Sequence, residues 1–229
     1  MTLEVWPSLL RPRRLMFHIM PALTVGPQSF GGLRQKRGGS AGSWVASAAF
    51  DVFSADEIRE WRGVVAALQG GLGTVKIGVF DDRQAPHPLD AGGRPILPGD
   101  EPFADGTLFT DGRGFLQSTI RAYLAGPLAL RATTAAVRVE AGGELKRGMY
   151  FSIAGRLYLI TSQPTREGSV WRFRFLPEAR LAAEDGTWVE LRRPTALMNL
   201  AAQDTGTLSL ESYYQGHPEI EFTESWDGL

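Results

Sequence analysis

The side chains of this sequence that most readily do acid–base chemistry are its three histidines, His18, His87 and His217. A hydrolase or transferase needs such a base beside a nucleophile. His18 lies in an apolar run that is typical of a packed strand, whereas His87 and His217 each precede a proline. No HExxH, HxH or GxGxxG motif occurs, so the histidines predict neither a catalytic site nor a zinc site.

Three glutamates near the end of the sequence could supply the paired carboxylates of a glycosidase: Glu219, Glu221 and Glu224. The first two are two residues apart in a segment with the pattern of a strand, so they share one face of it. A solvated stripe is the ordinary explanation of such a pair. We therefore expect no enzymatic activity, no catalytic residue and no cofactor. A hydrolase acting on cell walls remains an alternative that turnover of peptidoglycan would support.

A glycine-rich stretch over residues 26–42 carries the cations Arg34, Lys36 and Arg37. Backbone amides of glycine-rich turns can bind anions. The stretch lacks a Gly-Lys-Ser or Gly-Lys-Thr sequence, however, and a strand rather than a helix is expected after it. These features favour a mobile loop that links two strands or touches a neighbouring subunit.

Residues 81–114 are rich in proline, glycine and aspartate and have few apolar pairs. A loop of this length inside a domain is usually functional or a linker, so we place a boundary here. The aspartates lack the Asp-x-Asp-x-Asp-Gly spacing of a calcium loop, and solvated turns explain them better than a metal site. They are Asp81, Asp82, Asp90, Asp100, Asp105 and Asp111.

Four aromatic residues between positions 150 and 188 could stack against sugar rings: Tyr150, Tyr158, Trp171 and Trp188. Aromatic side chains of this kind are also the usual filling of a small β core. The sequence leaves both interpretations open, a glycan-binding platform and a packed interior.

The elements that must position these residues are best marked between residues 43 and 80. Small and β-branched residues over 44–53 predict a strand. Ser54 and Glu57 then form a capping box, which predicts a helix over 55–69, and the alternation over 74–80 predicts a further strand. One apolar stripe should dock the helix on the rest of the domain; its residues are Ile58, Trp61, Val65 and Leu68.

Further strands are expected on both sides of this unit. Residues 15–20 could form an edge or early strand, and Ala154-Gly155 predicts a two-residue turn between strands at 149–153 and 156–161. Residues 169–175 alternate between one wet face and one aromatic face. The remaining predicted strands are 130–140, 187–191, 208–214 and 219–223, and 195–206 is ambiguous.

The composition limits the classes of partner and compartment. The 229 residues include 24 basic and 25 acidic side chains, so no overall field attracts nucleic acid or anionic lipid. There is no cysteine, and no stretch approaches the roughly 20 apolar residues that span a bilayer. We expect a soluble, unsecreted protein without membrane insertion. Its 27 glycines and 14 prolines favour many short strands.

Taken together, blocks of residues along most of the chain resemble the distal tail proteins, or Dit-like minor tail proteins, of long-tailed siphophages and prophages. The blocks occur in a fixed order. They are Phe30-Gly31-Gly32, Gln35 and Trp44; Trp61, Leu68-Gln69-Gly70 and Gly73-Thr74; Leu130-Arg131-Ala132-Thr133-Thr134, Leu145, Gly148, Phe151-Ser152-Ile153 and Gly155-Arg156-Leu157-Tyr158; and Pro177-Glu178-Ala179-Arg180, Gly186, Val189-Glu190 and Pro194. Residues 81–114 do not match the family's pattern.

The resemblance implies a structural virion protein with a mainly β fold. In that arrangement residues 1–80 and 194–229 would form a ring-building β-sandwich scaffold with helix 55–69. Residues 81–114 would be a long loop or linker, and residues 115–193 an inserted small β-barrel or sandwich module. Such proteins form a ring, commonly a hexamer, at the tail tip or baseplate of the virion after assembly in the host cytoplasm. The implied partners are copies of itself, the tail tube protein and the hub or tip proteins, with DNA passing through the channel.

Two basic groups are candidates for the contact between subunits of such a ring. They are Arg11, Arg13 and Arg14 in the proline-punctuated start, and Arg34, Lys36 and Arg37 in the glycine-rich stretch. Cations facing the channel would bind DNA and slow its passage, so we expect the second group to meet acidic residues of a neighbouring subunit. The alternative function is a carbohydrate-binding module for attachment to the host cell, which a glycan array would detect.

Overall fold

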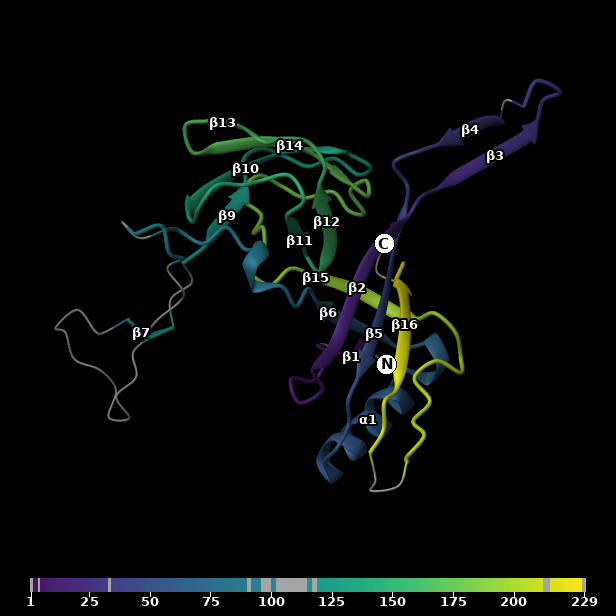
Figure 1. Ribbon diagram of the computed structural model, residues 1–229. Helices are drawn as coiled ribbons and strands as arrows, with labels where there is room; N and C mark the ends of the chain where they lie inside the picture. The colour runs from purple at the N-terminus through teal and green to yellow at the C-terminus, as the bar shows by residue number, and fades with distance from the viewer. Residues whose placement is uncertain are drawn as a thin grey trace.

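The computed structural model describes residues 2–3, 5–32, 34–89, 92–95, 100–101, 115–116, 119–211 and 215–227. The fold is mainly β with curled, largely antiparallel sheets and one α-helix, which confirms the predicted fold class (Figure 1). The strands are β1 Thr2–Leu3, β2 Pro12–Met20, β3 Leu23–Gln28, β4 Arg34–Gly38, β5 Ser43–Phe50, β6 Thr74–Gly78, β7 Asp100–Glu101, β8 Phe115–Leu116, β9 Arg121–Leu124, β10 Thr134–Ala141, β11 Tyr150–Ile153, β12 Arg156–Ile160, β13 Thr165–Glu167, β14 Val170–Leu176, β15 Thr195–Leu200 and β16 Glu219–Glu224; the helices are α1 Ala55–Ala67 and the 3-10 turns Gln69–Gly71 and Asp82–Gln84.

The first sheet has six strands in the order β1-β6-β15-β16-β5-β2. Its strands come from residues 2–78 and 195–224, so the two ends of the sequence meet in one sheet. β1 pairs with β6 in parallel, and the other neighbours are antiparallel. We call this sheet with α1 the first unit. The expected edge strand at 15–20 is β2, which is longer than expected and lies at one end of the strand order.

The helix α1 begins where the capping box predicts and ends at Ala67, two residues before the predicted end. The Glu57 amide donates to Ser54 Oγ over 3.1 Å, and the Ser54 amide donates to Glu57 Oε2 over 2.8 Å. Of the predicted apolar stripe, Val65 is only partly buried, and Val64 is buried at 4% exposure. The docked face is therefore rotated slightly towards Val64.

The core of the first unit lies between α1 and the curled sheet, and it is rich in aromatic rings. Trp61 on the helix lies 4.9 Å from Phe50 of β5 between ring centroids, and its indole nitrogen donates to the Gly206 carbonyl over 2.9 Å. Trp6 completes the group, 5.7 Å from Phe222 of β16. The first of these ring contacts is tilted and the second is edge-to-face, and aromatic pairs of this kind add stability beyond the area that they bury.

The second sheet has the order β11-β12-β14-β10-β9, with β13 paired to β14. We call it the second unit. The predicted alternation of β14 is confirmed: Trp171, Phe173 and Phe175 are buried, and the two intervening arginines are exposed. The predicted turn is also confirmed, because Ala154 and Gly155 both have positive φ, 50° and 78°, as a type I′ turn between β11 and β12 requires.

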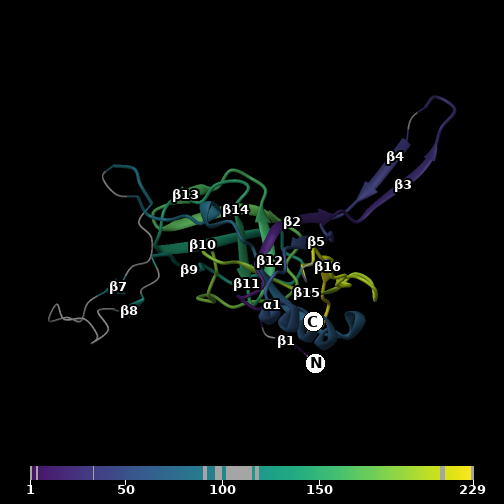
Figure 2. The same cartoon turned by 60° about the horizontal axis from the view of Figure 1, so that its bottom comes forward.

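The glycine-rich stretch is not a loop. Its strands β3 and β4 pair antiparallel, with Leu23 opposite Gly38 and Val25 opposite Lys36, and the register shifts between Val25 and Gln28. This two-stranded hairpin, residues 23–38, we call the arm. Both views show it extending away from the rest of the chain as a continuation of β2 and β5 (Figures 1 and 2). The expectation of a loop is wrong because the two strands are ordered by pairing with each other, and the local sequence pattern does not indicate this pairing.

Three other expectations change. Within the predicted linker 81–114, Ala85 and Pro86 pack on the second unit: Ala85 lies in its core, and Gly143 donates its amide to the Pro86 carbonyl over 2.7 Å. Residues 187–191 are predicted to form a strand, but they form two isolated bridges, at Trp188 and Glu190. No strand forms over 208–211, and 212–214 lie outside the described residues. The ambiguous segment after Pro194 contains β15.

Candidate interaction sites

The two faces of the edge strand β2 carry different side chains, one packed on the core and one exposed to solvent. Leu15, Phe17 and Ile19 point inward and pack against the core of the first unit. Met16 and Met20 point outward and are 51% and 55% exposed. Because β2 pairs only with β5 among the described strands, its other edge carries backbone groups that a further strand could pair with.

The first basic group lies near the start of β2. Arg11, Arg13 and Arg14 are all exposed, and the Arg13 guanidinium lies 3.7 Å from Asp51. Arg14 lies nine positions before Leu23, where the arm begins, about 30 Å at the rise of an extended chain. The six candidate interface cations therefore form two separate groups rather than one patch.

The second basic group lies on the arm, where Arg34, Lys36 and Arg37 are exposed. Lys36 shares a face with Val25, its cross-strand partner, whereas Arg37 is on the opposite face with Thr24. The arm also exposes apolar side chains: Leu23 is 46% and Val25 47% exposed, and Phe30 at the tip is fully exposed. Both faces of the arm therefore combine positive charge with solvent exposure.

The four aromatic candidates do not form a glycan platform. Tyr158 is completely buried and Trp171 is 8% exposed, and both lie in the core of the second unit. Tyr150 packs against the core of the first unit, 5.8 Å from Trp44. Only Trp188 is substantially exposed, at 40%. The packed interior is thus the correct interpretation for most of the set, because small β sheets fill their cores with aromatic rings.

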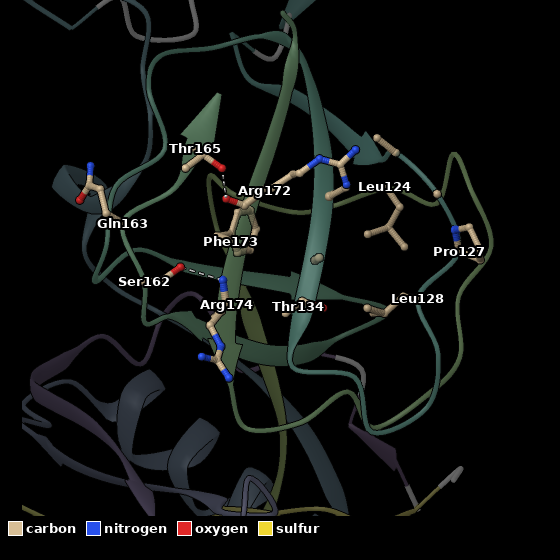
Figure 3. Close-up of a pocket in the computed structure, with 14 residues that line it drawn as sticks. Leu124, Pro127, Leu128, Thr134, Ser162, Gln163, Thr165, Arg172, Phe173 and Arg174 are labelled. Carbon is tan, nitrogen blue, oxygen red and sulfur yellow. Dashed lines mark hydrogen bonds between the residues drawn. The ribbon is translucent and has the colours of Figure 1, made fainter. Parts of the chain in front are cut away.

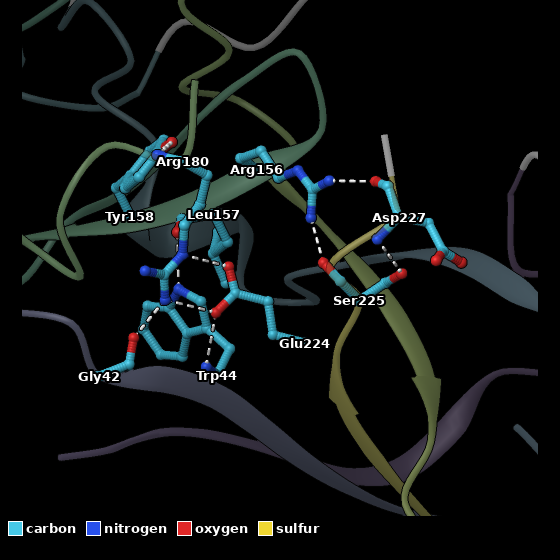
Figure 4. Close-up of polar contacts among 9 residues, drawn as sticks. All are labelled: Gly42, Trp44, Arg156, Leu157, Tyr158, Arg180, Glu224, Ser225 and Asp227. Carbon is cyan, nitrogen blue, oxygen red and sulfur yellow. Dashed lines mark hydrogen bonds and ion pairs between the residues drawn. The ribbon is translucent and has the colours of Figure 1, made fainter. Parts of the chain in front are cut away.

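A buried ion pair joins the two units (Figure 4). Arg180 Nε lies 2.9 Å from Glu224 Oε1, Arg180 Nη2 lies 2.9 Å from Glu224 Oε2, and both side chains are 3% exposed. The Trp44 amide adds a third donor, 3.0 Å from Oε2. Arg180 also donates to the Gly42 carbonyl and lies 4.5 Å from the centre of the Trp226 ring. The carboxylate and the guanidinium are thereby both satisfied away from water.

Further contacts around this pair tie the second unit to the strands of the first. Arg156 of β12 donates to the backbone carbonyls of Ser225 and Asp227, and burial lowers its pKa while Glu224 opposes that effect. The Trp44 indole donates to the Leu157 carbonyl over 2.6 Å. We call Arg156, Arg180 and Glu224 with their partners the polar junction. Its members come from sequence positions 42–44, 156–158, 180 and 224–227.

The glutamates are divided between the two faces of β16. Glu219 and Glu221 form the expected exposed stripe, while Glu224 faces inward in line with Ile220 and Phe222. The paired-carboxylate arrangement of a glycosidase is therefore absent from these three residues. The period-2 pattern of β16 could have placed Glu224 on the core face, but no local signal could have identified Arg180 as its partner.

The remaining candidate bases have ordinary surroundings. His18 is exposed on the outer face of β2 rather than packed, which corrects the expectation. His217 Nδ1 lies 2.8 Å from Asp51.

Residues 38–42 have the Gly-x-Ser-x-Gly spacing of a nucleophile elbow, which the sequence analysis did not identify. That motif needs a turn from strand to helix, whereas Ser40 lies between two strands and donates its hydroxyl to Glu178 over 2.7 Å.

Within the described part of the chain, no group of three His, Asp or Glu side chains has the arrangement of a metal site. None of the described helices is both long enough and apolar enough to cross a bilayer. No family model matches the sequence, and no curated protein matches it either.

Proposed function

We propose that the protein is a non-enzymatic structural subunit that assembles with copies of itself into a ring at the tip of a phage tail. Its partners there are the tail tube protein and the hub or tip proteins, and DNA passes through the central channel. The phage context rests on the resemblance of the ordered sequence blocks. The observation that carries the assembly is the arm, an extended hairpin without a core of its own.

The arm is built to be covered by another surface. None of its described residues is buried, and an isolated two-stranded hairpin is marginally stable in water at best. Leu23, Val25 and Phe30 offer apolar area. A partner surface that buries these side chains would stabilise the arm, and a row of exposed apolar residues on a projecting hairpin favours such an interface.

A matching surface is present on the same chain. Glu219 and Glu221 of β16 are exposed, and the register Met16–Ser47–Glu221 places them on the outer sheet face that carries the exposed methionines. This face also carries the exposed Arg14, which aligns with Glu219 through Ala49, so its acidic part is the pair of glutamates. The arm and the sheet face are different patches, so a contact between them is heterologous and can close into a ring. Complementary charge would also set its orientation.

Charge reversal tests this assignment on the full-length chain. Arg34→Glu, Lys36→Glu and Arg37→Glu together should convert a ring-sized species into monomers, measured by native mass spectrometry and light scattering. Adding Glu219→Lys and Glu221→Lys should restore part of the assembly. The matched control is Arg59→Glu with Arg62→Glu on the exposed face of α1, which should leave the mass unchanged. A wild-type chain that stays monomeric at every concentration, or normal tails assembled from the reversed variant, would refute the proposal.

Carbohydrate binding by the second unit is a second candidate function. The four aromatic residues do not support it, because Tyr158 and Trp171 are buried. The observation that favours it is a groove on the outer face of the second unit that carries Arg172 and Arg174.

A further inference from the structure

Two neighbouring hollows run along the outer face of the second unit. The first, of about 620 Å³, lies between the end of β9, β10 and β14 (Figure 3). The second, of about 590 Å³, is bordered by Ser40, Thr133 and Leu176. Ser162 and Arg174 line both of them, so the hollows adjoin at this point and form one elongated depression, which we call the groove.

The charged residues that line the groove are both positive, while the carboxylates of Asp185 and Glu178 bind its edges at Gly126 and Ser40. Arg172 and Arg174 are the charged residues in its lining, which contains no aspartate or glutamate. They alternate with inward-facing Phe173 on β14, so both point outward, and their Cα atoms are about 7 Å apart. Arg172 Nε lies 3.3 Å from Glu167 Oε2 at the rim. Arg174 makes no ion pair with any of the residues that the structure describes.

Neutral hydrogen-bonding side chains line the groove beside the backbone of β14. Ser162 Oγ accepts from the Arg174 amide over 2.8 Å, and the Thr165 hydroxyl lies 3.4 Å from the Arg172 carbonyl. Gln163 is exposed beside them, and Pro127 with Leu128 adds an apolar wall. Hydroxyl and amide groups that flank cations on an apolar base offer contacts to both the hydroxyl groups and the acidic groups of a sugar chain.

We propose that this groove binds an acidic polysaccharide. Arg174 would hold a carboxylate, sulfate or phosphate group through paired N–H donors, as guanidinium groups do. Arg172, one repeat of the strand away, would hold a second acidic group or exchange Glu167 for it. The open, elongated shape suits an extended polymer better than an enclosed small molecule. This site deepens the second candidate function and does not depend on the ring.

The test uses the full-length protein and polymers of known charge. Affinities for polygalacturonate and dextran sulfate are measured by biolayer interferometry at fixed ionic strength, and a phosphorylated dextran identifies phosphate as the preferred group. Arg174→Gln should weaken binding about tenfold, the typical effect of losing a charge-assisted hydrogen bond. Arg172→Gln should weaken it less. The matched control is Arg147→Gln, an exposed arginine of the same unit outside both hollows, which should bind as the wild type does.

Several outcomes would overturn the assignment. Equal weakening by Arg147→Gln would mean that overall surface charge is responsible, and binding of uncharged dextran with the same affinity would remove the role of the arginines. Tighter binding of an oligothymidylate of matched charge would identify the groove as a single-strand nucleic-acid site instead. Unfolding temperatures of the three variants should equal that of the wild type, because all three side chains are exposed. Since polymer binding and ring mass are separate measurements, failure of one proposal leaves the other standing.

Discussion

At the scale of single residues, the carboxylate of Glu224 decides how the two units meet. It accepts from both sides of the Arg180 guanidinium and from the Trp44 amide in a site that excludes water. Among the described residues, no buried side-chain nitrogen or oxygen lacks a hydrogen-bond partner. A buried pair of this type adds little net stability over an apolar replacement, but it penalises any arrangement that separates its members.

Removing one partner should therefore be costly. We expect Arg180→Met to lower the free energy of unfolding by roughly 3–5 kcal/mol, because Glu224 would be left charged and buried. The double variant Arg180→Met with Glu224→Leu should recover much of that loss. Denaturant titration of the full chain measures both. Arg131→Met is the control, since Arg131 lies 3.8 Å from Glu178 with 79% of its side chain exposed, and it should cost less than about 1 kcal/mol. A loss this small in Arg180→Met would contradict the account.

Tyr158 makes a second residue-scale prediction. Its hydroxyl oxygen accepts from the Arg180 amide over 3.0 Å, and burial raises the pKa of this phenol. A raised pKa means that the folded chain holds the proton more tightly than the unfolded chain. The stability that this pKa shift contributes to the folded chain is thus complete below about pH 10, the ordinary pKa of tyrosine. It is lost as pH rises through the pKa of Tyr158 in the folded chain.

Tyr158→Phe should cost roughly 1–3 kcal/mol at neutral pH, because the Arg180 amide loses its acceptor. The difference in stability between this variant and the wild type should shrink as pH is raised above about 10. Denaturant titrations between neutral and alkaline pH measure it. Tyr123→Phe, on the half-exposed β9 position, serves as the control for loss of a tyrosine hydroxyl and should cost less than Tyr158→Phe at neutral pH. If the difference in stability between Tyr158→Phe and the wild type stays constant as pH rises, ionisation of Tyr158 is not linked to stability.

At the scale of elements, local chemistry explains what the sequence could predict. The capping box, the β14 alternation and the Ala154-Gly155 turn each depend on residues within a few positions of one another, and all three are present. The polar junction depends on partners far apart in the chain, whereas the arm is a local hairpin whose sequence pattern does not mark its strands. Arg180 and Glu224 are separated by 44 residues, and the arm lacks the apolar alternation that marks a half-buried strand.

The start of α1 offers a direct test of the local signals. The amides of Ser54 and Phe53 lower the pKa of Glu57, so the box is complete at neutral pH and weakens as pH falls through that lowered value. Ser54→Ala should reduce the free energy of unfolding by about 1 kcal/mol, since the Glu57 amide loses its acceptor. Ser54→Asp should keep most of the stability. Thermal or denaturant unfolding resolves the two, and equal values for both would show that the cap contributes nothing.

At the scale of the whole molecule, the two units contact each other directly rather than being joined only by a linker. Leu157 of β12 lies in the core of the first unit, and the tip of the β11–β12 hairpin accepts the Leu197 amide at the Gly155 carbonyl over 3.0 Å. Cutting out residues 115–193 would remove Leu157 from the core of the first unit and leave Glu224 without Arg180. Binding and assembly are therefore properties to measure on the complete chain.

Within the described part of the first unit, the arm extends away from these shared contacts, so it can be removed without touching either core. Replacing residues 24–37 with Asn-Gly joins Leu23 to its cross-strand partner Gly38 through a two-residue turn. Residues 40–42 stay, so the Ser40–Glu178 and Gly42–Arg180 contacts are kept. We expect an unchanged unfolding temperature together with loss of the ring-sized species in native mass spectrometry. A variant that still assembles would show that the arm is not the interface, and a variant that unfolds would show that the arm serves its own chain.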